Sequence, residues 1–125
     1  MIKEEKEILY KDLCARLPYG VSVSILEYND YEAIEKLDAY WMERFYNPAY
    51  DIKPYLFPPQ SLPQELKEEI CKVADGIYTA EGWDAMIEVI DLMNKYKVDY
   101  RGLIPMGLAK DATGLNIYGN ETWEV

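Results

Sequence analysis

Residues 20–28 read "GVSVSILEY", and this stretch decides whether the chain contains a β-sheet. Val21, Val23 and Ile25 face one side of an extended backbone, while the serines between them face the other. An apolar set with a period of two is typical of a strand that buries one face. The sequence therefore predicts a half-buried strand here.

Three segments around this strand have helical periodicity instead, near residues 3–17, 62–75 and 80–95. In the first, Leu9, Leu13 and Leu17 recur every four residues, and Cys14 lies beside them. Lysines and glutamates cover the rest of this segment. The pattern predicts an amphipathic helix whose leucine stripe is buried.

The second and third helices have recognisable starts and faces. Ser61 and Gln64 have the spacing of a capping box in front of the second helix. The buried stripe of that helix contains Leu66 and Ile70, with Cys71 at its flank. Five large apolar residues line one face of the third helix: Trp83, Met86, Ile87, Ile90 and Met93.

Residues 31–46, "YEAIEKLDAYWMERFY", fit two structures. The spacing of Ile34, Leu37, Trp41 and Phe45 slightly favours a helix. The density of aromatic residues, with Asp38 as a turn, fits two short strands instead.

Residues 47–63 hold five of the seven prolines. Proline lacks a backbone donor, so this segment is expected to be an edge strand at most. We expect an extended chain with Tyr55, Leu56 and Phe57 packed on the core. The alternative is a polyproline ligand for an aromatic groove, but the apolar density of the segment argues against an exposed ligand.

Residues 99–112, "DYRGLIPMGLAKDA", either close the core or form a binding loop. Leu103, Ile104, Met106 and Leu108 lie too close together to be left singly in water, and glycines allow the backbone to bend between them. We therefore expect the segment to fold back onto the core. Arg101 is expected to bind Asp99, another carboxylate or carbonyl groups at the helix end. Arg101 and Asp99 form a candidate polar anchor.

Length and composition indicate one globular domain that spans residues 1–125, in which 113–125 forms a loosely packed tail. Half of the 125 residues are hydrophobic, so the chain can bury a core without a metal or a disulfide. No apolar run approaches the roughly 20 residues of a membrane span, and the charged N-terminus has no signal core. We expect a cytoplasmic protein that does not associate with membranes.

Charge and missing residue types exclude several functions. A net charge of −10 repels phosphate backbones, so direct binding to nucleic acid is disfavoured. There is no histidine, which removes the commonest general base and zinc ligand. We expect no metal and no cofactor. Cys14 and Cys71 have no metal-site spacing, and we expect both to be reduced and mostly buried.

Four motifs together resemble a family of small uncharacterised proteins of gut Bacteroidales and of their prophages and mobile elements. They are "KDLCARLPYGV" at 11–21, "KPYL" at 53–56, "TAEGW" at 79–83 and "DYRGLIPMGLAKDA" at 99–112. The first and last are the specific ones. The chain departs from the family where "NKYKV" replaces a segment that usually carries histidine, and where Phe57 stands in place of arginine.

The resemblance implies a fold and a context but no activity. It implies that residues 31–46 form strands, which makes the fold α+β: a small antiparallel sheet with about three helices packed against one face. It also implies an origin in a phage or another mobile element.

Three functions remain open. The first is a non-enzymatic protein-binding or adaptor module that contacts a protein partner or a second copy through an aromatic patch, for which the twelve tyrosines are suited. The candidate patch comprises Tyr40, Trp41, Tyr46, Tyr50, Tyr55 and Phe57. The second is an acidic nucleic-acid mimic that inhibits a DNA-binding enzyme. The third is an enzyme that relies on carboxylates such as Asp75, Glu81, Asp84, Asp99 or Asp111.

Overall fold

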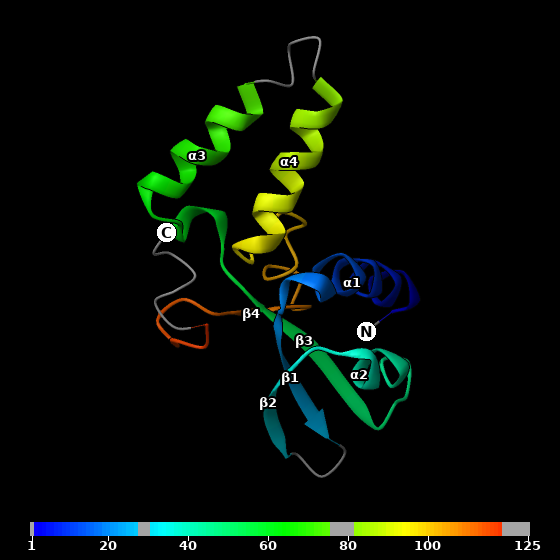
Figure 1. The fold of residues 1–125 in the computed structure, drawn as a ribbon. Helices are drawn as coiled ribbons and strands as arrows, with labels where there is room; N and C mark the ends of the chain where they lie inside the picture. The colour runs from blue at the N-terminus through cyan, green and yellow to red at the C-terminus, as the bar shows by residue number, and fades with distance from the viewer. Residues whose placement is uncertain (1, 28–30, 76–81, 119–125) are drawn as a thin grey trace.

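The computed structural model describes residues 2–27, 31–75 and 82–118 (Figure 1). In chain order the elements are α1 (Lys3–Arg16), η1 (Leu17–Tyr19), β1 (Ser22–Glu27), β2 (Glu32–Lys36), α2 (Ala39–Glu43), β3 (Tyr50–Leu56), η2 (Pro59–Ser61), α3 (Gln64–Ala74), α4 (Gly82–Lys95) and β4 (Lys110–Asp111). The predicted α+β class is confirmed. None of the helices in the described ranges is long and apolar enough to cross a bilayer.

The sheet has the strand order β2-β1-β3-β4. β1 is antiparallel to β2 and to β3, so that Ile25 lies between Ala33 on one side and Ile52 on the other. As predicted, Val23 and Ile25 are buried on one face of the strand. The expected antiparallel pairing is present in β2-β1-β3, but the sheet as a whole is mixed because β4 runs parallel to β3.

β3 is an internal strand, which corrects the prediction that the proline segment forms an edge at most. Proline is tolerated because β4 is only two residues long and pairs with Tyr55 and Leu56. Pro54 precedes that pairing and lies opposite Val23 of β1. As predicted, Tyr55, Leu56 and Phe57 are buried, which is inconsistent with an exposed polyproline ligand.

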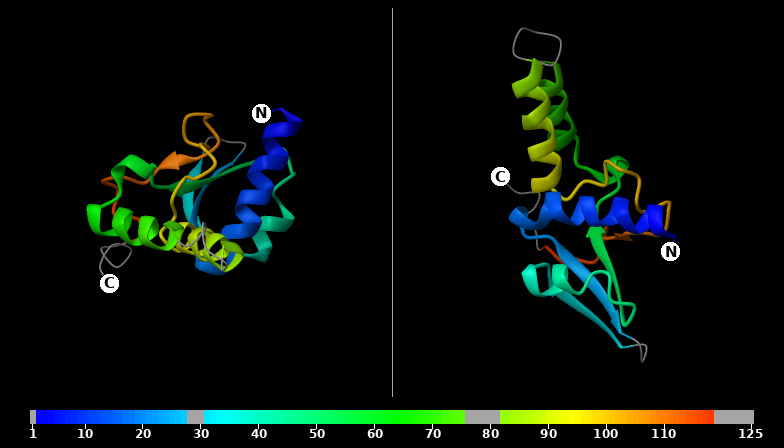
Figure 2. Two further views of the ribbon diagram at one scale, coloured as in Figure 1. Left: turned by 90° about the horizontal axis from the view of Figure 1, so that it is seen from above. Right: turned by 90° about the vertical axis from the view of Figure 1, so that its right-hand side faces the viewer.

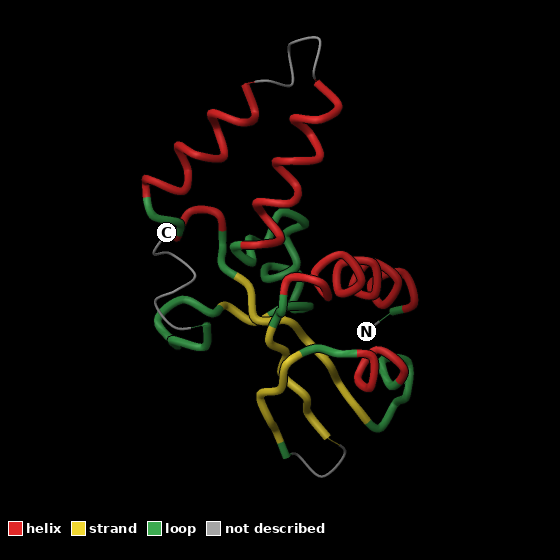
Figure 3. Tube along the Cα trace, in the orientation of Figure 1, coloured by secondary structure: helices red, strands yellow, loops and turns green. Residues whose placement is uncertain are grey.

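Residues 31–46 form one strand and one short helix. The sequence pattern predicts either a continuous helix or two short strands. β2 is followed by α2, and no continuous helix spans the segment (Figure 3). Asp38 separates them, and its carboxylate accepts a 3.1 Å hydrogen bond from the backbone N–H of Trp41. Asp38 therefore caps α2 instead of turning one strand into another.

A first core lies between α1, α2 and one face of the sheet. Leu9 and Leu13 of α1 pack with Val23, Ile52 and Phe45, and the last of these follows α2. Figure 2 shows α1 lying across the molecule between the sheet and the other two long helices.

Of the helices expected against the sheet, α1 lies across one face, whereas α3 and α4 contact the sheet only near the end of β3. These two form a hairpin that projects away from the sheet (Figures 1 and 2). A second core joins the hairpin to the body through Tyr55, Phe57, Leu66, Ile70 and Val98.

The predicted capping box is absent at the start of α3. The helix begins at Gln64 after Pro63, and the Ser61 hydroxyl donates a hydrogen bond to the carbonyl oxygen of Pro58.

Residues 99–112 fold back onto the core, as predicted. Leu103 and Leu108 are buried, Ile104 is half-buried, and Met106 is exposed. Gly102 and Gly107 have φ of 71° and 76°, a conformation that glycine adopts without strain. The segment therefore closes the first core.

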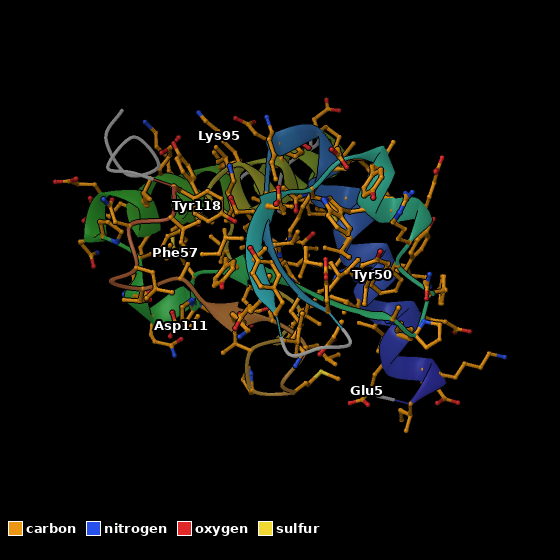
Figure 4. The ribbon with its side chains drawn as sticks, turned by 90° about the horizontal axis from the view of Figure 1, so that it is seen from below. Glu5, Tyr50, Phe57, Lys95, Asp111 and Tyr118 are labelled. Carbon is orange, nitrogen blue, oxygen red and sulfur yellow. The ribbon has the colours of Figure 1, made fainter. Side chains whose placement is uncertain are left out.

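Within the expected tail, residues 113–116 are exposed, whereas Ile117 and Tyr118 pack against the cores. Tyr118 packs against both cores, and its hydroxyl donates a 2.7 Å hydrogen bond to the carbonyl oxygen of Tyr55. Figure 4 shows Tyr118 beside Phe57, and their rings are 5.9 Å apart. Residues 119–125 lie outside the described part.

Candidate protein-binding surface

The hairpin uses only part of the apolar surface of α4. Ala85 is buried, and Val89 and Leu92 are half-buried within the second core. On α3, Leu66 and Ile70 are buried in the same core. Their spacing places these residues on the sides of the two helices that face each other.

A second apolar strip of α4 is exposed. The fractional exposures are 80% for Trp83, 42% for Met86, 59% for Ile87 and 47% for Ile90. We call these four residues the α4 face. Their spacing of three and four residues places them on one side of the helix. Large apolar side chains gathered on one side of a helix are typical of an interaction site.

One edge of the α4 face is acidic. Asp84, Glu88 and Asp91 each directly follow a residue of the face, so they lie about 100° further around the helix. Tyr19 donates a 2.8 Å hydrogen bond to Asp91 Oδ1, which raises the pKa of the Tyr19 hydroxyl. Through this hydrogen bond, Asp91 connects the acidic edge of α4 to η1.

An apolar cavity of about 470 Å³ lies at the base of the hairpin. It is lined by Pro59, Leu62, Ile70, Met93, Val98 and Tyr100, with Lys67 and Cys71 beside them. Ligand pockets have volumes of roughly 300–1,000 Å³ and mostly apolar walls. Met93 is seven residues after Met86, two turns along the same side of α4. The cavity therefore continues the α4 face toward the body.

The predicted aromatic patch is not a single surface. Tyr55 and Phe57 are buried, and the other four residues lie around α2 and the start of β3. Figure 4 shows Tyr50 and Phe57 well apart. The prediction was wrong for Tyr55 and Phe57. β3 begins near α2 and ends at the second core, so these two residues are buried there.

The exposed aromatic residues of the predicted patch, Tyr40 and Tyr46, contact other side chains of the same chain. Tyr40 is half-exposed, but its ring packs edge-on against Trp41 at 4.8 Å and lies under the Arg44 guanidinium at 3.3 Å. Tyr46 is also exposed and contacts Tyr10, with ring centroids 5.4 Å apart. Tyr40 thus packs within α2 and Tyr46 packs against α1, so both rings are less available to a partner than the α4 face.

The candidate polar anchor is structural, and its two residues do not pair with each other. The Asp99 carboxylate is buried and accepts hydrogen bonds from the backbone N–H groups of Leu103 and Ile104, at 2.8 and 2.9 Å. Arg101 pairs instead with Asp12, with 3.2 Å between Nε and Oδ1. Both residues therefore hold the folded-back segment in place.

The candidate catalytic carboxylates do not converge. Asp75 ends α3, Asp84 lies at the start of α4, Asp111 is on β4, and Asp99 is committed to backbone groups. Glu81 lies outside the described residues. Within the described ranges, no group of three or more cysteine and carboxylate residues could hold a metal ion.

A second cavity, of about 340 Å³, does contain two carboxylates. Glu5 and Asp51 line it together with Lys6 and Lys53. Lys53 Nζ lies 3.8 Å from Asp51 Oδ2, and Glu5 accepts a hydrogen bond from the backbone of Ile2 at the start of α1. Each carboxylate thus has a structural partner, and the cavity has no pair poised for acid–base chemistry.

The prediction that both cysteines are mostly buried was wrong. Cys14 and Cys71 are free thiols, and both are exposed. On α1 the buried stripe is rotated away from Cys14 because Asp12 and Arg16 are buried beside Leu9 and Leu13.

Apolar spacing in the sequence identified the residues of the α4 face but not their exposure. Apolar side chains extend around more than half of α4, since Ala85, Val89 and Leu92 lie on a different side from Trp83 and Ile87. A helix with such a broad apolar surface can bury one side against a neighbouring helix and still expose apolar side chains on another side. That breadth is the signal that could have revealed the surface.

Comparison of the chain with protein-family models, with curated proteins and with solved structures found no significant match in any of the three.

Proposed function

We propose that this chain is a non-enzymatic protein-binding module and that the α4 face is the surface that contacts its partner. The observation that carries the proposal is the exposure of four large apolar side chains on one side of α4, between 42% and 80% each. Burying such a strip against a partner yields roughly 25 cal/mol per Å² of apolar area.

The position of the α4 face also supports a binding role. The hairpin projects from the body, so a partner can approach α4 without displacing the first core (Figure 1). The dispersed carboxylates give no comparable support for catalysis. The resemblance described above supports a phage or mobile-element origin for the module.

The test uses variants that change the surface and leave the fold intact. We would compare the native chain with Ile87→Gln/Ile90→Gln as bait in cells that naturally express it. Ile34→Gln is the matched control, because Ile34 is an exposed isoleucine on β2. The partner recovered should then be purified, and its affinity for each chain measured by calorimetry.

We expect the native chain and Ile34→Gln to bind the purified partner equally, and the α4 variant to bind at least tenfold more weakly. Equal thermal melts would show that the variants are folded. Loss of binding in Tyr40→Ala/Tyr46→Ala, with full binding by the α4 variant, would move the interface to α2 and overturn the proposal.

A further inference from the structure

We infer that the occupant of the α4 face is a basic amphipathic helix, one of whose large apolar side chains enters the cavity at the base of the hairpin. This inference rests on the proposed function, since it assigns the chemistry of the partner to the surface already described.

The shape of the surface favours a helix. Trp83 and Met93 are ten positions apart, so the strip extends about 15 Å along the α4 axis. That length matches about three turns of a partner helix with apolar residues spaced three and four apart. A helix laid along the α4 face would pack its apolar side against α4, as a third helix beside the hairpin.

The cavity supplies the anchoring position. Met93 lies on the strip side of α4 and also lines the cavity, so a helix seated on the strip passes over its mouth. The other walls include Leu62, Ile70 and Val98, which are apolar and mostly buried. A leucine or phenylalanine side chain fits these walls, whereas a charged group would lose its hydration there.

Charge selects a basic partner over a second copy of this chain. α3 and α4 together carry six carboxylates and three lysines, and three of the carboxylates form the edge of the α4 face. Two copies packed antiparallel through the α4 face would place these acidic edges side by side, in a chain whose net charge is already −10. A helix with lysines or arginines beside its apolar stripe would instead place positive charge along Asp84, Glu88 and Asp91.

The test uses three synthetic 14-residue peptides with blocked ends and a fluorescent label. The first has leucines along one side and lysines elsewhere. The second replaces those lysines with glutamates, and the third has the composition of the first in an order that spreads the leucines around the helix. We expect the first to bind at least tenfold more tightly than either control by anisotropy in moderate salt. Equal binding of the first two would overturn the charge assignment.

The two cysteines report where the peptide lies. Cys71 lines the cavity, whereas Cys14 is on α1. Cys14→Ser isolates the Cys71 thiol, and Cys71→Ser provides the matched reporter at Cys14. Saturating basic peptide should slow the reaction of Cys71 with a thiol reagent at least tenfold and leave Cys14 unchanged. Equal rates at Cys71 with and without bound peptide would overturn the anchoring position.

Three further outcomes separate this inference from the proposed function. If the native partner requires Ile87 and Ile90 but the basic peptide does not bind, the partner chemistry is wrong and the binding surface stands. If sedimentation shows a dimer that Ile87→Gln/Ile90→Gln dissociates, a second copy covers the face and the inference is overturned. If the peptide binds but the native partner ignores the α4 variant, the proposed function fails.

Discussion

Arg16 and Val98 are 82 residues apart in the sequence, and Arg16 Nη2 donates a 2.7 Å hydrogen bond to the carbonyl oxygen of Val98. The same guanidinium bonds through Nε to Asp12 Oδ2, also at 2.7 Å, and lies over the ring of Tyr100. Asp12 and Arg16 are both fully buried. Arg16, held in place by Asp12, therefore links α1 to the segment that follows α4, where the two cores meet.

Removing the charge of Asp12 should destabilise the fold strongly. Asp12→Asn leaves the buried Arg16 without its counter-ion, which typically costs about 3–5 kcal/mol. Urea unfolding at pH 7 would measure the loss. Arg101→Ala removes the partly exposed member of the cluster and should cost about 1 kcal/mol or less. A loss for Asp12→Asn no larger than that of Arg101→Ala would contradict the structural role of the buried pair.

Truncating Leu103 tests the closure of the first core. Leu103 is fully buried, so Leu103→Ala should lower the free energy of unfolding by about 2–5 kcal/mol. Met106→Ala, three residues away at an exposed position, is the matched control and should leave the melting temperature nearly unchanged. Ile104 is half-buried, so Ile104→Ala should destabilise the fold by an amount between those of Leu103→Ala and Met106→Ala. A melting temperature that rises in Leu103→Ala would show that this segment does not close the core.

The pairing of Glu32 with Lys110 should make stability depend on pH. Lys110 Nζ lies 2.8 Å from Glu32 Oε1, and Ser24 donates to the same oxygen at 2.6 Å. The hydrogen bond from Lys110, followed by that from Ser24, holds the pKa of Glu32 below its ordinary value. The stabilisation from a lowered carboxyl pKa is present above the pKa of the unfolded chain and is lost as pH falls through the folded-state pKa.

Lys110→Met should therefore be less stable than the native chain at pH 7, and the difference should shrink as pH falls below the lowered pKa of Glu32. Urea midpoints at a series of pH values would show this convergence. Lys53→Met, which removes the weaker contact to Asp51, is the control. A difference that stays constant down to strongly acidic pH would rule out Glu32 as the titrating partner.

Duplex DNA should not bind this chain at physiological salt. Ten excess negative charges oppose the release of counterions that drives such binding. A gel shift with low micromolar protein in moderate salt measures it, and a shifted band would contradict the prediction. The mimic hypothesis predicts separately that reversing Glu65, Glu68 and Glu69, all exposed on α3, abolishes inhibition of a DNA-binding enzyme.

Local patterns predicted much of the secondary structure. Alternation at Val21, Val23 and Ile25 identified β1, and apolar spacing of three and four residues identified α1, α3 and α4 to within a few residues. The crowding of Leu103 and Leu108 predicted that their segment returns to the core. Each of these features depends on residues close in sequence, so the sequence alone determined it.

Contacts between distant segments decided the rest. Asp12 and Arg16 are charged residues outside the leucine stripe of α1, but Arg101 and Val98 contact them and that side of α1 is buried, which leaves Cys14 exposed. Periodicity likewise places Trp83 and Ile87 on one side of α4, but it does not say which side faces α3. The sequence by itself determined which residues share a face. The tertiary structure decided which faces are covered, because covering a face depends on segments that are distant in the chain.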